Sequence, residues 1–223
     1  MRQTQLPRTP AAVVLDMDGT LLDTESIYIR TFLETAATLG FPLPEAFLHT
    51  LVGLPGSDFQ TRLRAHLGED FPYAEHRRLY LARRTELLDA GIGIKPGALE
   101  LLDHLEAARM PMAIATAATR ANAEENLARS GLRHRFAVVL TRDDVEHSKP
   151  RPDLFLRAAA GIGIAPQHCL AVEDSHNGVR AAHAAGMMTV MVPDIVNATA
   201  EIRALCVAVV ATLHDVRRMV GGS

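Results

Sequence analysis

Two carboxylates one residue apart, Asp16 and Asp18, are the first residues in the sequence whose types and spacing could do chemistry. Three more polar segments follow along the chain: Thr116, Lys149-Pro150 and Glu173-Asp174-Ser175. A carboxylate pair can supply a nucleophile and a general acid or base, a threonine can hold an oxyanion, and a lysine can balance charge. Each segment alone is common in turns and helix caps. The prediction of a catalytic site therefore depends on their order and on the elements that carry them.

Each of these segments follows a short apolar run of the kind that forms a strand buried on both faces of a parallel sheet. The runs cover residues 11–15, 111–115, 137–140, 168–172 and 187–192, with a shorter one at 207–210. Segments of helical period lie between them, at 98–109, 121–129, 152–160 and 175–185. This alternation predicts an α/β fold with a doubly wound, Rossmann-like parallel sheet. Because the carboxyl ends of parallel strands share one edge, the four polar segments should meet there.

The stretch from about residue 24 to 90 differs, because its apolar residues fall at helical spacing and it contains no convincing strand. We therefore expect two domains: an α/β core made of residues 1–23 and 92–223, and an inserted α-helical cap domain made of residues 24–91. Leu22-Asp23 and the glycine-containing segment 91–97 are the expected hinges between them.

Four segments of the sequence resemble the motifs of the haloacid dehalogenase superfamily: DMDGTLLDTE, IATAATR, SKPRPD and VEDSHNGVRAA. The resemblance covers nearly the whole chain, since the helical insert is similar to that superfamily's small cap, the C1 cap. The most similar group is that of β-phosphoglucomutase and phosphoglycolate phosphatase. The DxDGT form of the first motif implies phosphoryl transfer, because the dehalogenases themselves lack the second aspartate.

The resemblance implies a role for each motif residue. Asp16 would attack phosphorus and form an aspartyl phosphate, and Asp18 would be the general acid and then the base. Thr116 and the backbone N–H of Ala117 would hold phosphoryl oxygens, with Lys149 beside them. The implied metal ligands are the Asp16 carboxylate, the Asp18 carbonyl and the Asp174 carboxylate, with Glu173 bound directly or supporting them from behind.

Charge arithmetic predicts Mg²⁺ as the cofactor. Asp16, Asp18, Glu173 and Asp174 carry −4 when ionised, and Lys149 reduces this only to −3, which would repel a phosphate dianion. A Mg²⁺ ion changes the sum to −1, and protonation of Asp18 brings it to zero. Hard oxygen ligands and a phosphoryl substrate favour Mg²⁺ over zinc.

The leading functional prediction is a Mg²⁺-dependent phosphatase acting on a small phosphate monoester, such as a sugar phosphate. The alternative is a β-phosphoglucomutase-like phosphomutase. Relative to those mutases the chain has Tyr28 in place of a cap histidine, lacks an arginine near Gly56, and has Thr119-Arg120 in place of a Lys-Asn pair. Thr24, Tyr28 and Arg120 are nevertheless expected to contact substrate.

Two other classes of protein and a zinc site are disfavoured by the sequence. A response-regulator receiver domain is disfavoured, because its phosphoacceptor lies on a middle strand and it has no cap. A non-catalytic binding protein is disfavoured by the complete motif set. A zinc site at His176 and His183, seven residues apart on one expected helix, lacks a third ligand.

The composition limits the partners. The 223 residues carry a net charge of −3, which gives no overall electrostatic reason to bind nucleic acid or an anionic membrane. The apolar run at 11–15 is too short for a signal sequence or a membrane span, and two cysteines do not make a disulfide framework, so we expect a cytoplasmic monomer or small homo-oligomer. Of the 23 cations 21 are arginine, and the two lysines are Lys149 and Lys95, the second without an expected role.

Overall fold

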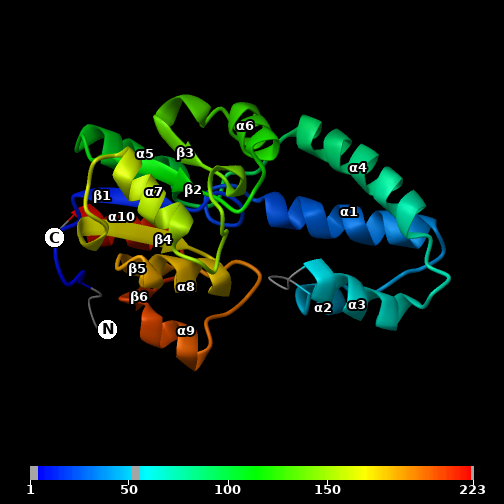
Figure 1. Ribbon diagram of the computed structural model, residues 1–223. Helices are drawn as coiled ribbons and strands as arrows, with labels where there is room; N and C mark the ends of the chain where they lie inside the picture. The colour runs from blue at the N-terminus through cyan, green and yellow to red at the C-terminus, as the bar shows by residue number, and fades with distance from the viewer. Residues whose placement is uncertain (1–4, 52–55, 222–223) are drawn as a thin grey trace. The chain divides into compact units, whose positions relative to one another are not determined.

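Six short strands form one sheet in the computed structural model, which describes residues 5–51 and 56–221 (Figure 1). They are β1 Ala12–Leu15, β2 Met112–Ala115, β3 Val138–Leu140, β4 Cys169–Glu173, β5 Met188–Met191 and β6 Ala208–Val209. The strand order is β3-β2-β1-β4-β5-β6, and every neighbouring pair is parallel. This is the order of a doubly wound sheet, so the predicted fold class is confirmed.

The central strands are buried on both faces, which explains why their sequences are continuous apolar runs. All four residues of β1 are buried, and β1 pairs with β2 on one side and with β4 on the other. In register, Leu15 lies beside Ile114 and Val172. The chain therefore leaves β1 and β4 at the same edge of the sheet.

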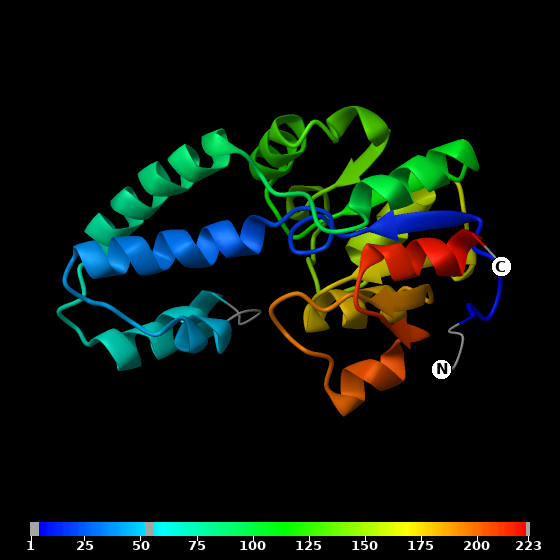
Figure 2. The ribbon, with the colours of Figure 1, turned by 180° about the vertical axis from the view of Figure 1, so that it is seen from behind.

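Helices cover the two faces of this sheet. The helices that alternate with the strands or follow them are α5 Ala98–Ala107, α6 Arg120–Arg129, α7 Asp153–Gly161, α8 His176–Ala184, α9 Ala200–Leu205 and α10 Leu213–Gly221. Three 3₁₀ turns join them, η1 Arg133–Arg135, η2 Arg142–Asp144 and η3 Pro166–His168. α7 and α8 pack small and apolar side chains onto one face, and α5 and α10 lie together on the other, as Figures 1 and 2 show from opposite sides.

Three of these helices, α6, α8 and α9, begin at side-chain caps that the sequence encodes, and two of the caps adjoin predicted motifs. The Thr119 side chain accepts a hydrogen bond from the Asn122 N–H at the start of α6, and the Ser175 side chain accepts one from the Gly178 N–H at the start of α8. Such caps satisfy backbone donors that have no partner within the helix. They also fix where the chain turns from strand to helix at the edge of the sheet.

The chain divides into two compact units, Met1–Asp23 with Gly93–Ser223, and Thr24–Ile92. The second unit is helical: α1 Thr24–Thr38, α2 Glu45–His49, α3 Gly56–Leu67 and α4 Tyr73–Ala90. It has its own apolar cluster, in which Leu48, Leu51 and Leu63 are buried. Within the described ranges, no helix is long and apolar enough to span a membrane.

Candidate active site

The two acidic motifs lie where the connections of the sheet change direction, between β1 and β4. Asp16 follows β1 directly and donates its N–H to the Val172 carbonyl at 3.0 Å, while Glu173 is the last residue of β4. Doubly wound sheets bind their ligands at this point, beyond the carboxyl ends of the strands. The structure therefore brings together the first and the last of the predicted motifs.

Lys149 joins these motifs into one cluster. Its Nζ donates to Asp16 Oδ1 and, at 2.6 Å, to Glu173 Oε1. The lysine side chain is only 5% exposed, and the side chains of Asp16 and Glu173 are 8% and 0% exposed. The predicted convergence of the first, third and fourth motifs is present in the structure.

Glu173 is held on both of its oxygens. While Oε1 accepts from Lys149, Oε2 accepts from the backbone N–H groups of Asp174 and Ser175 and from the Ser175 hydroxyl, each at 3.0 Å. A Cβ on Gly178 would lie 1.7 Å from Glu173 Oε1, so only glycine fits there. This geometry favours the supporting role of Glu173, behind the lysine, over direct metal ligation.

Asp18 and Thr116 are also brought together. The Thr116 hydroxyl lies 3.4 Å from Asp18 Oδ2 and accepts the Ala118 N–H at 3.0 Å. Asn126, a buried residue of α6 that we did not single out from the sequence, places Nδ2 3.4 Å from Asp18 Oδ1. Its position one and a half turns into the helix, outside the motif, gave no signal.

Asp174 is buried beside the loop that follows β1. Its Oδ1 accepts a hydrogen bond from the Thr20 hydroxyl at 3.0 Å. A Cβ on Gly19, which has φ +81°, would lie 2.4 Å from Asp174 Oδ2 and 3.3 Å from Asp194 Oδ2. Asp194, in the loop after β5, is a further acidic residue at this edge that the sequence analysis missed, because no motif contains it.

Burial and crowding perturb the ionisation of the cluster. Burial raises the pKa of Asp16 well above its usual value, and the charges of Glu173 and Asp18 add to this, although Lys149 opposes it. Burial and the charges of Glu173 and Asp16 likewise raise the pKa of Asp174. Burial alone would lower the pKa of Lys149, but Asp16 and Glu173 outweigh it and raise that pKa. The site carries more negative charge than one lysine balances.

The donor set fits a divalent cation. Asp16 and Asp174 offer buried carboxylate oxygens, which are hard ligands, and a cation bound between them would offset the burial and the neighbouring negative charges that raise their pKa values. Across residues 5–51 and 56–221, no three His, Cys, Asp or Glu side chains gather as a preformed metal site. Mg²⁺ is commonly held in this way, by one or two carboxylates with waters and substrate phosphate.

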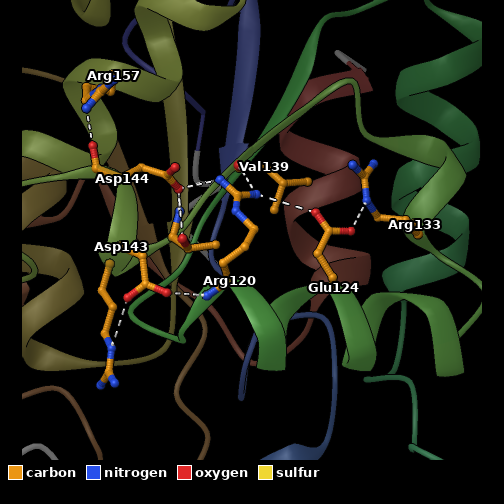
Figure 3. A network of polar contacts seen from close by, with 9 residues as sticks. Arg120, Glu124, Arg133, Val139, Asp143, Asp144 and Arg157 are labelled. Atoms are coloured by element: carbon orange, nitrogen blue, oxygen red, sulfur yellow. Dashed lines mark hydrogen bonds and ion pairs between the residues drawn. The ribbon is translucent and has the colours of Figure 1, made fainter.

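Arg120 is engaged elsewhere in the core (Figure 3). Its guanidinium donates to Asp144 Oδ2 at 2.5 Å, to the Val139 carbonyl at 3.0 Å and to Glu124 at 3.4 Å. Its backbone N–H donates to Asp143 Oδ2 at 2.7 Å. These contacts join α6 to η2, the turn that begins the segment carrying Lys149. Substrate contact by Arg120 stays a prediction.

The other predicted residues are placed as follows. Ala117 is exposed directly after Thr116, and Thr24 is the buried first residue of α1 in the helical unit. His176 and His183 contact the backbone carbonyls of Asn197 and Leu205 at 2.9 and 3.1 Å. The position near Gly56 adjoins residues 52–55, which lie outside the described residues.

A family model described as haloacid dehalogenase-like hydrolase matches residues 13–192, a range that contains all four motifs. The chain belongs to the haloacid dehalogenase-like hydrolase family. The predicted family is thereby confirmed, and the matched range contains Asp16, Lys149, Glu173 and Asp174.

Individual relatives agree with this assignment. The hydrolase is 35% identical to protein CbbY of Rhodobacter capsulatus over 82% of its own length and 85% of the relative. It is 36% identical to the fructose-1-phosphate phosphatase YqaB of Escherichia coli, over 79% and 93% of the two chains. A hydrolase of the same family from Deinococcus radiodurans, solved with phosphate and sodium bound, has a TM-score of 0.81 and 25% identity, with 94% of each chain covered. The predicted enzyme class, a phosphatase of this family, is confirmed.

Proposed function

We propose that this hydrolase is a Mg²⁺-dependent phosphatase that removes phosphate from a small phosphorylated metabolite through an aspartyl phosphate on Asp16. The observation that carries the proposal is the buried cluster of Asp16, Lys149 and Glu173, next to Asp174, at the switch point of the sheet. The relatives support the substrate class, since one is named for a sugar phosphate and a structural neighbour holds phosphate.

The proposed reaction has two steps that share Asp16 and Asp18. In the first, an Asp16 oxygen attacks phosphorus, the ester P–O bond breaks, and the Asp18 carboxylic acid gives its proton to the leaving alkoxide. In the second, the Asp18 carboxylate takes a proton from water, whose oxygen attacks phosphorus as the Asp16 O–P bond breaks. Phosphate leaves, and both residues return to their starting protonation states.

The remaining residues hold charge and position. The Thr116 hydroxyl and the Ala117 N–H would bind phosphoryl oxygens, while Thr116 and Asn126 orient Asp18. Lys149 fixes Asp16 and stays charged between two carboxylates. Asp16, Asp174 and the Asp18 carbonyl would hold Mg²⁺, which when bound supplies positive charge to the phosphoryl oxygens and the carboxylates.

Hydrolysis is favoured over the phosphomutase alternative by two residues at the start of α6, its N-cap and its first residue. At the positions where the mutases have a Lys-Asn pair, Thr119 caps the helix and Arg120 binds the η2 turn. Both side chains therefore have contacts within the sheet unit that a Lys-Asn pair would not make in the same way.

The test is phosphate release from a panel of hexose phosphates, phosphoglycolate, nucleotides and pyrophosphate, with glucose 1-phosphate to glucose 6-phosphate conversion assayed separately. We expect Mg²⁺-dependent release that falls at least ~10³-fold in Asp16→Asn, while the exposed Glu201→Gln variant matches the parent. Rapid quench of Asp18→Asn with p-nitrophenyl phosphate should trap one phosphoryl group on the peptide containing Asp16. Turnover resistant to EDTA, or a phosphoryl group on another peptide, would contradict the proposal.

A further inference from the structure

Lys95 is the second of the two lysines, and the structure pairs it with Asp194. Its Nζ donates to Asp194 Oδ1 at 2.6 Å, and the two side chains are 22% and 16% exposed. The Lys95 N–H donates to the Leu21 carbonyl at 2.9 Å, so the lysine is attached to the loop that carries Asp16 and Asp18. The pair therefore lies at the same edge of the sheet as the proposed site.

The other carboxylate oxygen of Asp194, Oδ2, is buried and has no such partner among the described residues. The point that a Cβ on Gly19 would occupy lies 3.3 Å from this oxygen and 2.4 Å from Asp174 Oδ2. A buried carboxylate oxygen without a donor is costly, so a donor is expected to reach it from the side of Asp174.

We propose that Asp194 is a positioning residue for the metal site, whose free oxygen accepts a hydrogen bond from a water on the ion that Asp174 would hold. The proposal rests on the proposed Mg²⁺-dependent function. Mg²⁺ keeps several of its waters when a protein binds it, and acceptors for those waters set the affinity. Lys95 holds Oδ1 and thereby directs Oδ2 toward Asp174.

The charge of the pair agrees with this role. A fifth carboxylate without a partner would add negative charge to a site whose four carboxylates already outnumber its one lysine. Lys95 cancels the charge of Asp194 while leaving one oxygen available as an acceptor. The pair would thus offer a hydrogen-bond acceptor to a water on the ion without changing the net charge of the site.

The direct test is isothermal titration of Mg²⁺ into the full-length parent and the Asp194→Asn variant without substrate. In this variant Lys95 retains the amide oxygen, so the NH₂ group faces Gly19 and cannot accept a hydrogen bond. We expect the Kd for Mg²⁺ to rise about 10-fold. The Mg²⁺ concentration for half-maximal phosphatase activity should rise by the same factor, while kcat at saturating Mg²⁺ stays within about threefold.

Two variants separate this role from a purely structural ion pair. Lys95→Met with Asp194→Leu removes both charges together, which keeps the fold testable if the single variant unfolds, and should also weaken Mg²⁺ binding about 10-fold. Asp103→Asn breaks the Arg135–Asp103 pair on another part of the core and should lower thermal stability with an unchanged Kd.

The outcomes distinguish the two proposals. A parent that binds no Mg²⁺ overturns the proposed metal dependence and this inference with it. A parent that binds Mg²⁺, with Asp194→Asn within twofold of it, overturns only the role of Asp194. Weak binding in Asp194→Asn but parental binding in the double variant would show an effect of unbalanced charge and would equally overturn it.

Discussion

At the scale of single residues, Lys149 determines how the acidic cluster can be buried. Its ammonium contacts a carboxylate from each of the two neighbouring strand ends, and its Nζ also lies 5.1 Å from the centre of the Phe155 ring. These contacts leave room for a compact cation with donors in several directions. A guanidinium is larger and planar, and its donors lie in one plane.

Lys149→Arg should therefore lose activity although it keeps the charge. We expect kcat to fall at least ~10²-fold, the size of effect seen when one charge-stabilising donor is lost, because arginine must displace Asp16 or Glu173. Initial rates at saturating substrate and Mg²⁺ measure this, and thermal melting checks that the variant is folded. Arg180→Lys, at an exposed pair with Glu201, is the matched control and should be neutral. Near-parental turnover in Lys149→Arg would show that charge alone suffices.

The sequence indicated the charged residues of the site better than the residues that support them. Asp16, Lys149 and Glu173 each follow a recognisable strand, so their convergence could be predicted from topology. Asn126 contacts Asp18 only because α6 directs its side chain toward the loop after β1, which no local pattern shows. Gly178 contributes through its lack of a side chain, which makes space for Glu173 beside α8, and the motif alone does not show this.

At the scale of elements, strands were easier to predict than the last helices. The six strands are largely apolar runs between polar loops, and each predicted run overlaps one observed strand, with β4 extending one residue further, to Glu173. α9 has six residues and one buried side chain, Ile202, so it gives almost no periodic signal. α10 buries Leu213, Val216 and Val220 at spacings of three and four, a helical pattern that the sequence analysis did not use.

The contact between α6 and η2 positions the loop that leads to Lys149. The Asp144 carboxylate accepts hydrogen bonds from the Arg120 guanidinium and, at 2.7 Å each, from the N–H and hydroxyl of Thr141 (Figure 3). The Arg157 guanidinium donates to the Asp144 backbone carbonyl. Burial opposes ionisation of Asp144, but these hydrogen bonds outweigh it and lower its pKa to about 2. A lowered carboxyl pKa stabilises the fold above the usual value of 3.8, and this stability is lost as pH falls toward 2.

Arg120→Met should remove part of this stability. We expect the free energy of unfolding at pH 7 to fall by about 1–2 kcal/mol, because a charge-assisted hydrogen bond at a partly exposed site is lost. The difference from the parent should shrink between pH 4 and pH 2, since Asp144 becomes protonated there. Urea unfolding at several pH values measures it, and the Arg120→Met/Asp144→Asn cycle isolates the pair. If KM rises instead with stability unchanged, Arg120 acts on substrate, as the sequence first indicated.

At the scale of the whole molecule, the two compact units have separate cores and respond to different conditions. In the helical unit His76 is 6% exposed, its ring lies 4.3 Å from the Phe32 ring, and its Nε2 lies 3.0 Å from the Thr35 hydroxyl. Burial lowers the pKa of His76 from its usual 6.5, and a hydrogen bond with the Phe32 backbone opposes only part of this. The folded helical unit therefore favours the neutral form of the His76 ring.

Mild acid should consequently weaken the helical unit before the sheet unit. Below pH 6.5 the unfolded segment takes up a proton on His76 that the folded unit resists, so stability is complete above pH 6.5 and declines as pH falls. One proton limits the slope to about 1.4 kcal/mol per pH unit. Hydrogen exchange of the amides in residues 24–92 between pH 7.5 and 5, corrected for intrinsic rates, measures this opening, with the amides of β1 and β4 as internal reference.

Two variants decide whether His76 is the titrating group. His76→Leu keeps an apolar side chain in the core and should remove the pH dependence of opening in residues 24–92, whatever its effect on stability. His66→Gln changes an exposed histidine of the same unit and should leave that dependence as in the parent. The assignment fails if His76→Leu still loses protection toward pH 5, because the proton uptake would then belong to another group of the helical unit.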